Sequence, residues 1–152
     1  MRYIAVVGAS ECSPEVYEMA REVGREIARS GAILVCGGRG GVMEAACRGA
    51  TEAGGVAIGI LPGLDRSSQN PYVTYSIVTG LGDARNAVLV RSADAVIAIS
   101  GGYGTLSEIG LALKAGRRVV GLKTWEIKKD DGDTNHLIGA SSPKEAVMLA
   151  MG

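Results

Sequence analysis

Short uninterrupted runs of apolar residues alternate along the chain with longer segments in which apolar residues recur every three or four positions. The short runs are typical of strands buried on both faces, and the longer segments have the spacing of amphipathic helices. This alternation predicts an α/β fold, Rossmann-like and doubly wound, with a mainly parallel sheet of six or seven strands and right-handed crossovers. The predicted strands cover residues 3–7, 32–36, 56–61, 73–78, 95–99, 117–122 and, at an edge, 136–140, and the predicted helices cover residues 14–31, 42–53, 84–92, 105–115 and a short segment after 142.

Residues that favour helix starts indicate where the helices begin. Thr105 and Glu108 have the spacing of a capping box, so we expect a helix to begin at Thr105 with its free N–H groups pointing back at the preceding loop. Such a helix start attracts anions. The other predicted caps are Ser13 before Pro14, Asp83 before the helix 84–92, and Ser142 with Glu145.

The composition bounds the size of the fold and the class of partner. At 152 residues with 47% hydrophobic content, the chain is long enough for one compact nucleotide-binding domain, residues 1–152, and too short to suggest two. Its 16 basic and 16 acidic side chains give a formal net charge of zero, so no overall field favours a nucleic-acid or membrane partner. No segment approaches membrane-spanning length. Recognition of a small molecule remains open.

The three cysteines, Cys12, Cys36 and Cys47, are scattered through the first third of the chain. They form no CxxC pair and have no histidine at zinc-binding spacing, so we expect neither a disulfide framework nor a metal site, and no cofactor. Free thiols are typical of the cytoplasm, which is the location we expect.

Three predicted strands end in glycine-containing loops. In an open α/β sheet the loops at the carboxyl ends of the strands surround the ligand crevice, so a nucleotide or phosphorylated sugar is the expected ligand. No Ser, Thr, Asp or Asn caps the helix at Val42, which would leave its first N–H groups available to phosphate; a purely structural turn is the alternative. The candidate binding residues are Gly8, Ser10, Gly37, Gly38, Gly40, Gly41, Met43, Gly101, Gly102, Gly104 and Thr105.

Two common nucleotide motifs do not fit these loops. Neither Gly102-Tyr-Gly104 nor Gly38-Arg-Gly40 completes the G-x-G-x-x-G fingerprint of dinucleotide-binding proteins. The chain contains no G-x-x-x-x-G-K-[ST] sequence, which excludes a P-loop nucleotidase at the level of motifs.

The segment from Gly101 to Glu108, Gly-Gly-Tyr-Gly-Thr-Leu-Ser-Glu, resembles the P-G-G-x-G-T-x-x-E signature of the Lonely Guy family. Residues 36–43 resemble that family's glycine-rich loop, and Arg85 lies nine residues before Asp94, as the family's catalytic arginine does. The resemblance covers roughly residues 1 to 120. It implies a homodimeric enzyme that hydrolyses a nucleoside 5′-monophosphate to free base and ribose 5-phosphate, with an AMP-like substrate.

The chain also departs from that family's pattern. Ser100 replaces the proline of the signature, Gly82-Asp83-Ala84-Arg85-Asn86 replaces M-H-E-R-K, and phenylalanine is absent. In these features the chain is similar to a neighbouring branch that includes molybdenum-cofactor carrier proteins, which bind a phosphorylated pterin. The alternative function is therefore a non-catalytic carrier of a phosphorylated nucleotide or pterin.

The resemblance implies that Arg85 and Glu108 are catalytic. Glycosidic cleavage passes through an oxocarbenium-like state, so a carboxylate near the anomeric carbon can stabilise charge or activate water. The alternative for Glu108 is a role in the capping box. The alternative for Arg85 is a pair with a surface carboxylate or a side chain that extends into solvent. We expect Met43 to pack in the core and Trp125 to cover a core edge or a subunit contact. His136 is expected at the surface or in an edge strand.

Overall fold

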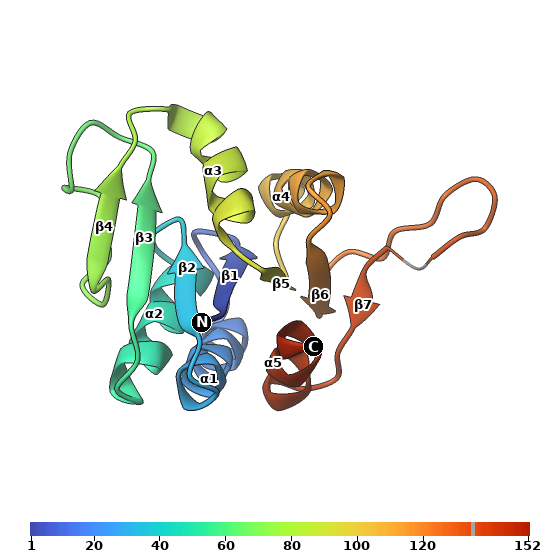
Figure 1. Ribbon diagram of the computed structural model, residues 1–152, viewed down its shortest axis with the longest axis horizontal. Coiled ribbons are helices and arrows are strands. Elements are labelled where there is room, and N and C mark those ends of the chain that lie inside the picture. The colour runs from blue at the N-terminus through green and yellow to red at the C-terminus, as the bar shows by residue number, and fades with distance from the viewer. Residues whose placement is uncertain (135) are drawn as a thin grey trace.

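The computed structural model describes residues 1–134 and 136–152. Within them, seven strands form one parallel sheet in the order β4-β3-β2-β1-β5-β6-β7 (Figure 1), which confirms the predicted Rossmann-like α/β fold. The strands are β1 (Tyr3–Gly8), β2 (Ile33–Cys36), β3 (Ala57–Leu61), β4 (Tyr75–Val78), β5 (Ala95–Ile99), β6 (Arg118–Leu122) and β7 (Ile138–Gly139). The helices are α1 (Pro14–Arg29), α2 (Val42–Glu52), α3 (Arg85–Ser92), α4 (Tyr103–Lys114) and α5 (Pro143–Met151), and a 3₁₀ turn, η1 (Gly82–Ala84), precedes α3.

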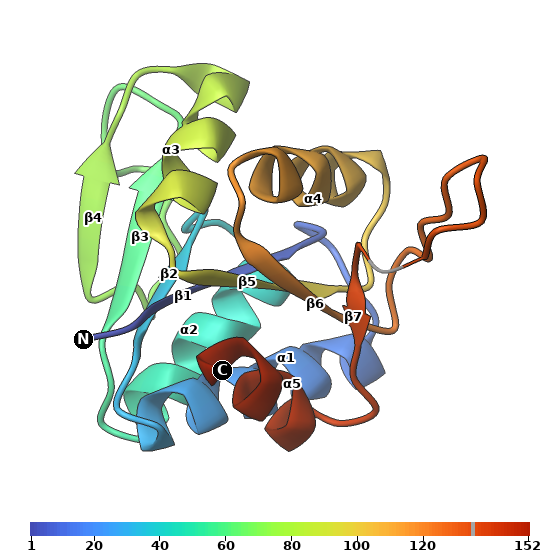
Figure 2. The same ribbon diagram turned by 45° about the vertical axis from the view of Figure 1, so that its right-hand side comes forward.

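The strand order reverses direction beside β1. From β1 the chain builds outward through β2, β3 and β4, and then crosses back to place β5 on the other side of β1. The helices divide between the two faces of the sheet, with α1, α2 and α5 on one face and α3 and α4 on the other (Figure 2). In doubly wound sheets such a reversal opens a crevice at the carboxyl ends of the two central strands.

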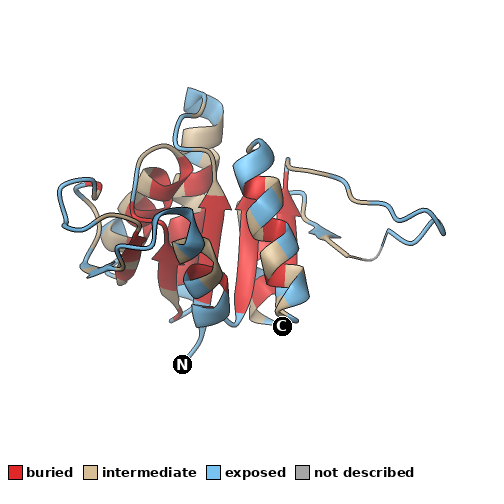
Figure 3. Ribbon diagram, turned by 90° about the horizontal axis from the view of Figure 1, so that it is seen from above, coloured by how far each residue is buried: buried red, intermediate tan, exposed pale blue. Residues whose placement is uncertain are grey.

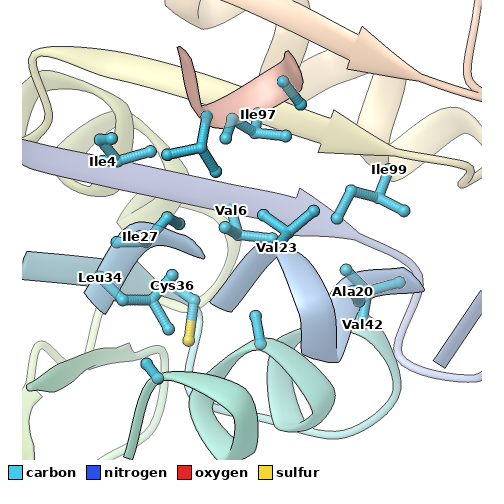
Figure 4. Packing of buried hydrophobic residues seen from close by; sticks show 14 of the residues in the cluster. Ile4, Val6, Ala20, Val23, Ile27, Leu34, Cys36, Val42, Ile97 and Ile99 are labelled. Carbon is cyan, nitrogen blue, oxygen red and sulfur yellow. The ribbon is translucent and has the colours of Figure 1, made fainter. Parts of the chain in front are cut away.

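The central strands of the sheet are buried (Figure 3). Each face of the sheet is covered by its own layer of apolar side chains. Alternate residues of β1 supply both layers: Ile4 and Val6 pack toward α1 and α2, and Ala5 and Val7 pack toward α3 and α4. Figure 4 shows the first layer, where Ile97 and Ile99 of the neighbouring strand join Ile4 and Val6. None of the helices in the described residues is long and apolar enough to cross a membrane.

The helices α1 and α2 approach so closely that glycine is required where they meet. A Cβ atom at Gly49 would lie 1.8 Å from the carbonyl oxygen of Arg21, and one at Gly24 would lie 2.0 Å from that of Ala46. Real Cβ atoms do not approach backbone oxygen this closely, so part of the high glycine content serves packing.

The structure corrects two predicted helix starts. The helix α4 begins at Tyr103 with Gly102 as N-cap and no side-chain cap. The prediction that Thr105 and Glu108 form a capping box is therefore wrong. The reason is the turn before it: Gly101, at φ +91°, starts the helix two residues early and leaves Thr105 buried in the first turn. Asp83 lies within the 3₁₀ turn η1 and caps nothing, because α3 continues directly from that turn.

Other predicted boundaries hold within a few residues. Ser13 and Ser142 are N-caps whose hydroxyl oxygens accept the N–H of Val16 and Glu145. At the predicted edge strand only Ile138–Gly139 pairs with β6, and His136 lies before it. The residues between β6 and the edge strand, 124–135, are rich in charged side chains and are predicted from the sequence to form a loop, and the last of them lies outside the described residues.

Candidate functional site

A cleft of about 350 Å³ opens where the loops after β1, β2 and β5 meet the start of α3. This is the crevice expected where the strand order reverses. The cleft is lined by Gly8, Ala9, Ser10, Arg39, Met43, Asp83, Arg85, Asn86, Gly102, Gly104, Thr105 and Glu108. The fold thus brings eight of the thirteen predicted site residues to one cleft. The other five, Gly37, Gly38, Gly40, Gly41 and Gly101, do not line it.

The N-terminus of α4 presents unpaired backbone donors to the cleft. The first helical bond runs from the N–H of Leu106 to the carbonyl of Gly102, at 3.0 Å. The N–H groups of Tyr103, Gly104 and Thr105 make no hydrogen bond to a described residue. Because neither Gly102 nor Gly104 has a side chain, a ligand can approach this backbone directly. Together with the helix dipole, these donors form an anion-binding cradle.

The N-terminus of α2 is less available than the sequence predicts. Among the first N–H groups of α2, which the sequence predicts to be available to phosphate, that of Val42 is not, because it donates to the carbonyl of Ala9 at 3.1 Å. A Cβ atom at Gly41 would lie 2.3 Å from that same carbonyl oxygen, which shows how tightly the loop after β1 covers this helix start. The glycines here serve mainly to let two loops pack together.

Arg85, the first residue of α3, is held by main-chain carbonyls. Its Nη1 donates to the carbonyl oxygens of Gly37 at 2.7 Å and Ile60 at 2.6 Å, and its Nε donates to Oδ1 of Asn86 at 2.7 Å. Nη2 has no hydrogen-bond partner in the described part of the chain. Burial lowers the pKa of Arg85 while the charge of Glu108 opposes this, and the guanidinium stays charged at neutral pH. The predicted alternative, an ion pair with a surface carboxylate, is not formed among these residues.

Glu108 projects into the same cleft from the second turn of α4. Its carboxyl group makes no hydrogen bond or ion pair with a described residue. Burial raises the pKa of Glu108 from its ordinary 4.5 to about 7, and the opposing effect of Arg85 is smaller. A half-buried carboxyl group that faces a cation without contacting it leaves room for a ligand between the two.

Arg39 also lines the cleft, and the sequence predictions missed it. Its side chain is exposed and has no hydrogen bond or ion pair in the described residues. Its backbone is fixed by the buried Asn70, whose Nδ2 donates to the carbonyl of Arg39 at 2.8 Å and whose N–H donates to that of Gly38 at 2.8 Å. An arginine placed among four glycines of a loop is the signal that could have identified it.

The other single residues behave largely as predicted. Met43 packs in the core at 8% exposure, and it also lines the cleft. Trp125 packs against the core layer of α3 and α4 and donates its Nε1–H to the carbonyl of Gly102 at 3.0 Å. His136 lies near Asp133, with 3.5 Å between Nε2 and Oδ2. Neither Trp125 nor His136 lines this cleft.

Two molybdenum-related proteins match the whole fold closely. The molybdenum cofactor binding protein from Rippkaea orientalis superposes with a TM-score of 0.89 and 39% sequence identity, over 99% of this chain and 95% of that protein. The molybdenum cofactor carrier protein from Chlamydomonas reinhardtii superposes with a TM-score of 0.87 and 36% identity, over 99% and 97%.

The chain is also similar to enzymes. A cytokinin riboside 5′-monophosphate phosphoribohydrolase from Arabidopsis thaliana is 33% identical over 112 residues, which cover 71% of this chain and 49% of that protein. The chain therefore spans about half the length of this curated relative. These likenesses confirm the resemblance to the Lonely Guy family near the molybdenum-cofactor carrier branch. The sequence model of one family matches residues 1–147, nearly the whole chain, and the protein belongs to that family, SLOG cluster4.

Proposed function

We propose that the protein hydrolyses the N-glycosidic bond of a nucleoside 5′-monophosphate, releasing the free base and ribose 5-phosphate. One observation carries this proposal: Glu108 and Arg85 line the same cleft as the uncapped N-terminus of α4, with no ion pair between the two side chains. A carboxyl group, a cation and an anion cradle are the groups that this reaction requires, and they meet at the crevice of the sheet.

The phosphate of the substrate binds the backbone N–H groups at the start of α4, where the helix dipole favours negative charge. The unpaired Nη2 of Arg85 then donates to hydroxyl groups of the ribose. Its other donors are fixed by Gly37, Ile60 and Asn86, so the guanidinium is oriented before the substrate arrives. The anomeric carbon of a ribose bound in this way would lie beside Glu108, which lines the same cleft.

Cleavage breaks the bond between C1′ and the base nitrogen, and the electron pair leaves with the base. Positive charge develops on C1′ and the ring oxygen, where the Glu108 carboxylate stabilises it. A water oxygen then bonds to C1′, one of its protons passes to Glu108, and a solvent proton completes the departing base. One water is consumed, and Glu108 returns its proton to solvent. A pKa of about 7 suits a group that takes and releases a proton near neutral pH.

The second candidate is a carrier that binds a phosphorylated pterin in this cleft and releases it unchanged. The observation that favours it is the match to the molybdenum cofactor binding and carrier proteins, which extends over 99% of this chain at 36–39% identity. By sequence alignment, the phosphoribohydrolase from Arabidopsis thaliana matches 71% of this chain. In this candidate the same α4 cradle holds the phosphate, and Glu108 performs no chemistry.

Chromatography distinguishes the two candidates. The pure protein is incubated with AMP and other nucleoside 5′-monophosphates, and free base and ribose 5-phosphate are measured over time. We expect both products in equal amounts, and we expect Glu108→Gln to reduce the rate by about 100-fold or more, the usual contribution of general acid–base catalysis. Binding of these nucleotides without any release of base would refute the enzyme and leave the carrier.

A further inference from the structure

The N-terminus of α4 and Arg85 together supply too little positive charge to balance a bound phosphate monoester. A phosphate monoester carries a charge of about −1.5 to −2 at pH 7. The N-terminus of α4 supplies only about half a positive charge. Arg85 is already bonded to two carbonyl oxygens and faces Glu108. Arg39 is the remaining cation in the cleft lining, and no described residue pairs with it.

Arg39 lies on a loop across the cleft from the N-terminus of α4. The loop that carries Arg39 follows β2, the loop before α4 follows β5, and β1 lies between these strands. Two strand spacings separate the loops by about 10 Å. A long side chain on one loop can therefore close over a group bound at the other.

The backbone of Arg39 is fixed although its side chain is exposed. Asn70, at 5% exposure, holds the carbonyl oxygens of both Gly38 and Arg39, and its own Oδ1 accepts the N–H of Tyr72 at 2.9 Å. The long segment between β3 and β4 thus anchors the glycine loop. A fixed backbone with an exposed, unpaired guanidinium means that only side-chain motion is needed for Arg39 to reach a ligand.

We propose that Arg39 is a ligand-binding residue whose guanidinium binds the ligand's phosphate from the side opposite α4, and that Asn70 is the positioning residue for it. This inference rests on the proposed function only in that a phosphate monoester occupies the cleft. It holds for a nucleotide and for a phosphorylated pterin alike. Because Arg matches phosphate geometry with paired donors, lysine at this position is a partial replacement.

The test measures binding of ribose 5-phosphate by calorimetry, with ribose as the uncharged comparison. We expect Arg39→Ala to weaken ribose 5-phosphate binding by about 10- to 100-fold, as expected for loss of a charge-assisted hydrogen bond, and to leave ribose unaffected. Arg39→Lys should weaken it less. Arg91→Ala is the matched control, because it removes the same charge from a residue that is exposed on α3 and lies outside the cleft.

The salt dependence of ribose 5-phosphate binding distinguishes a direct contact of Arg39 with the phosphate from an indirect effect on the structure. Affinity of the wild-type protein for ribose 5-phosphate should fall as salt rises, and this dependence should be weaker in Arg39→Ala. Equal affinities of wild type and Arg39→Ala would overturn the assignment even if the protein hydrolyses AMP normally. Failure of the wild-type protein to bind ribose 5-phosphate, AMP or a phosphorylated pterin would overturn both this inference and the proposed function.

Discussion

Replacing Glu108 by glutamine should stabilise the protein at alkaline pH while lowering its activity by about 100-fold or more. The wild-type carboxyl group is half-buried without a hydrogen bond among the described residues, so its ionised form is disfavoured in the folded state. Glutamine has nearly the same shape and never ionises. The substitution therefore removes an electrostatic penalty while it removes the group that stabilises charge on the sugar.

The size of the effect follows from the pKa. Folding raises the pKa of Glu108 from 4.5 to about 7, which corresponds to about 3 kcal/mol at 1.36 kcal/mol for each pH unit. Between these two values the unfolded chain has lost the proton and the folded protein keeps it, so wild-type stability falls as pH rises through this window. Below pH 4.5 both states are protonated and the penalty is absent. Above pH 7 it is complete.

Urea denaturation at several values between pH 4.5 and pH 8.5 provides the assay. We expect the free energy of unfolding of Glu108→Gln to exceed that of wild type by about 2 to 3 kcal/mol at pH 8, and the difference to shrink toward acid pH. A capping carboxylate would give the opposite sign, because ionisation at a helix start is favourable. A difference that is constant with pH, or that favours wild type at pH 8, would refute a raised pKa for Glu108.

Three further substitutions test the scaffold around the site. Arg85→Lys keeps the charge and one nitrogen that can reach the two carbonyl oxygens, but it loses the separate Nε donor to Asn86 and the unpaired Nη2 donor. The value of kcat/KM for AMP should therefore fall about 100-fold, and unchanged kinetics would exclude this role. Asn70→Ala removes buried hydrogen bonds and should lower the free energy of unfolding, measured in urea, by about 1–3 kcal/mol. An unchanged urea midpoint would mean that the glycine loop of Arg39 keeps its conformation without Asn70. Gly49→Ala must push α1 and α2 apart, so it should lower the free energy of unfolding by about 1–3 kcal/mol and the Tm with it. The control is Gly110→Ala, whose added Cβ atom would have no neighbour within 4 Å and should not lower the Tm.

The sequence predicts the sheet well because its information is local. Buried parallel strands are short apolar runs, and the run of residues 95–99 was recognisable without knowledge of its neighbours. The position of a helix start is harder, because it depends on backbone torsion. Ser100 and Gly101 both have positive φ, and this turn starts α4 before Thr105 can act as a cap. A spacing rule for capping boxes does not include that torsion.

Part of the site depends on contacts between residues far apart in the chain, which the sequence alone does not predict. Nothing near Arg85 in the sequence shows that its guanidinium binds the carbonyl oxygens of Gly37 and Ile60, at the ends of two other strands. Asn70, which binds the backbone of the Arg39 loop, comes from the segment 62–71, whose polar composition predicts only an exposed loop.

The carbonyl oxygens that bind Arg85 lie at the ends of β2 and β3, while Glu108 comes from the helix after β5. The relative position of cation and carboxyl group is therefore set by the packing of the whole central sheet. A ligand that binds both groups must favour that packing, since each side chain contributes only when the strands are in register. AMP or ribose 5-phosphate should accordingly raise the Tm of the wild-type protein more than that of Arg85→Ala, in proportion to the affinity that Arg85 supplies.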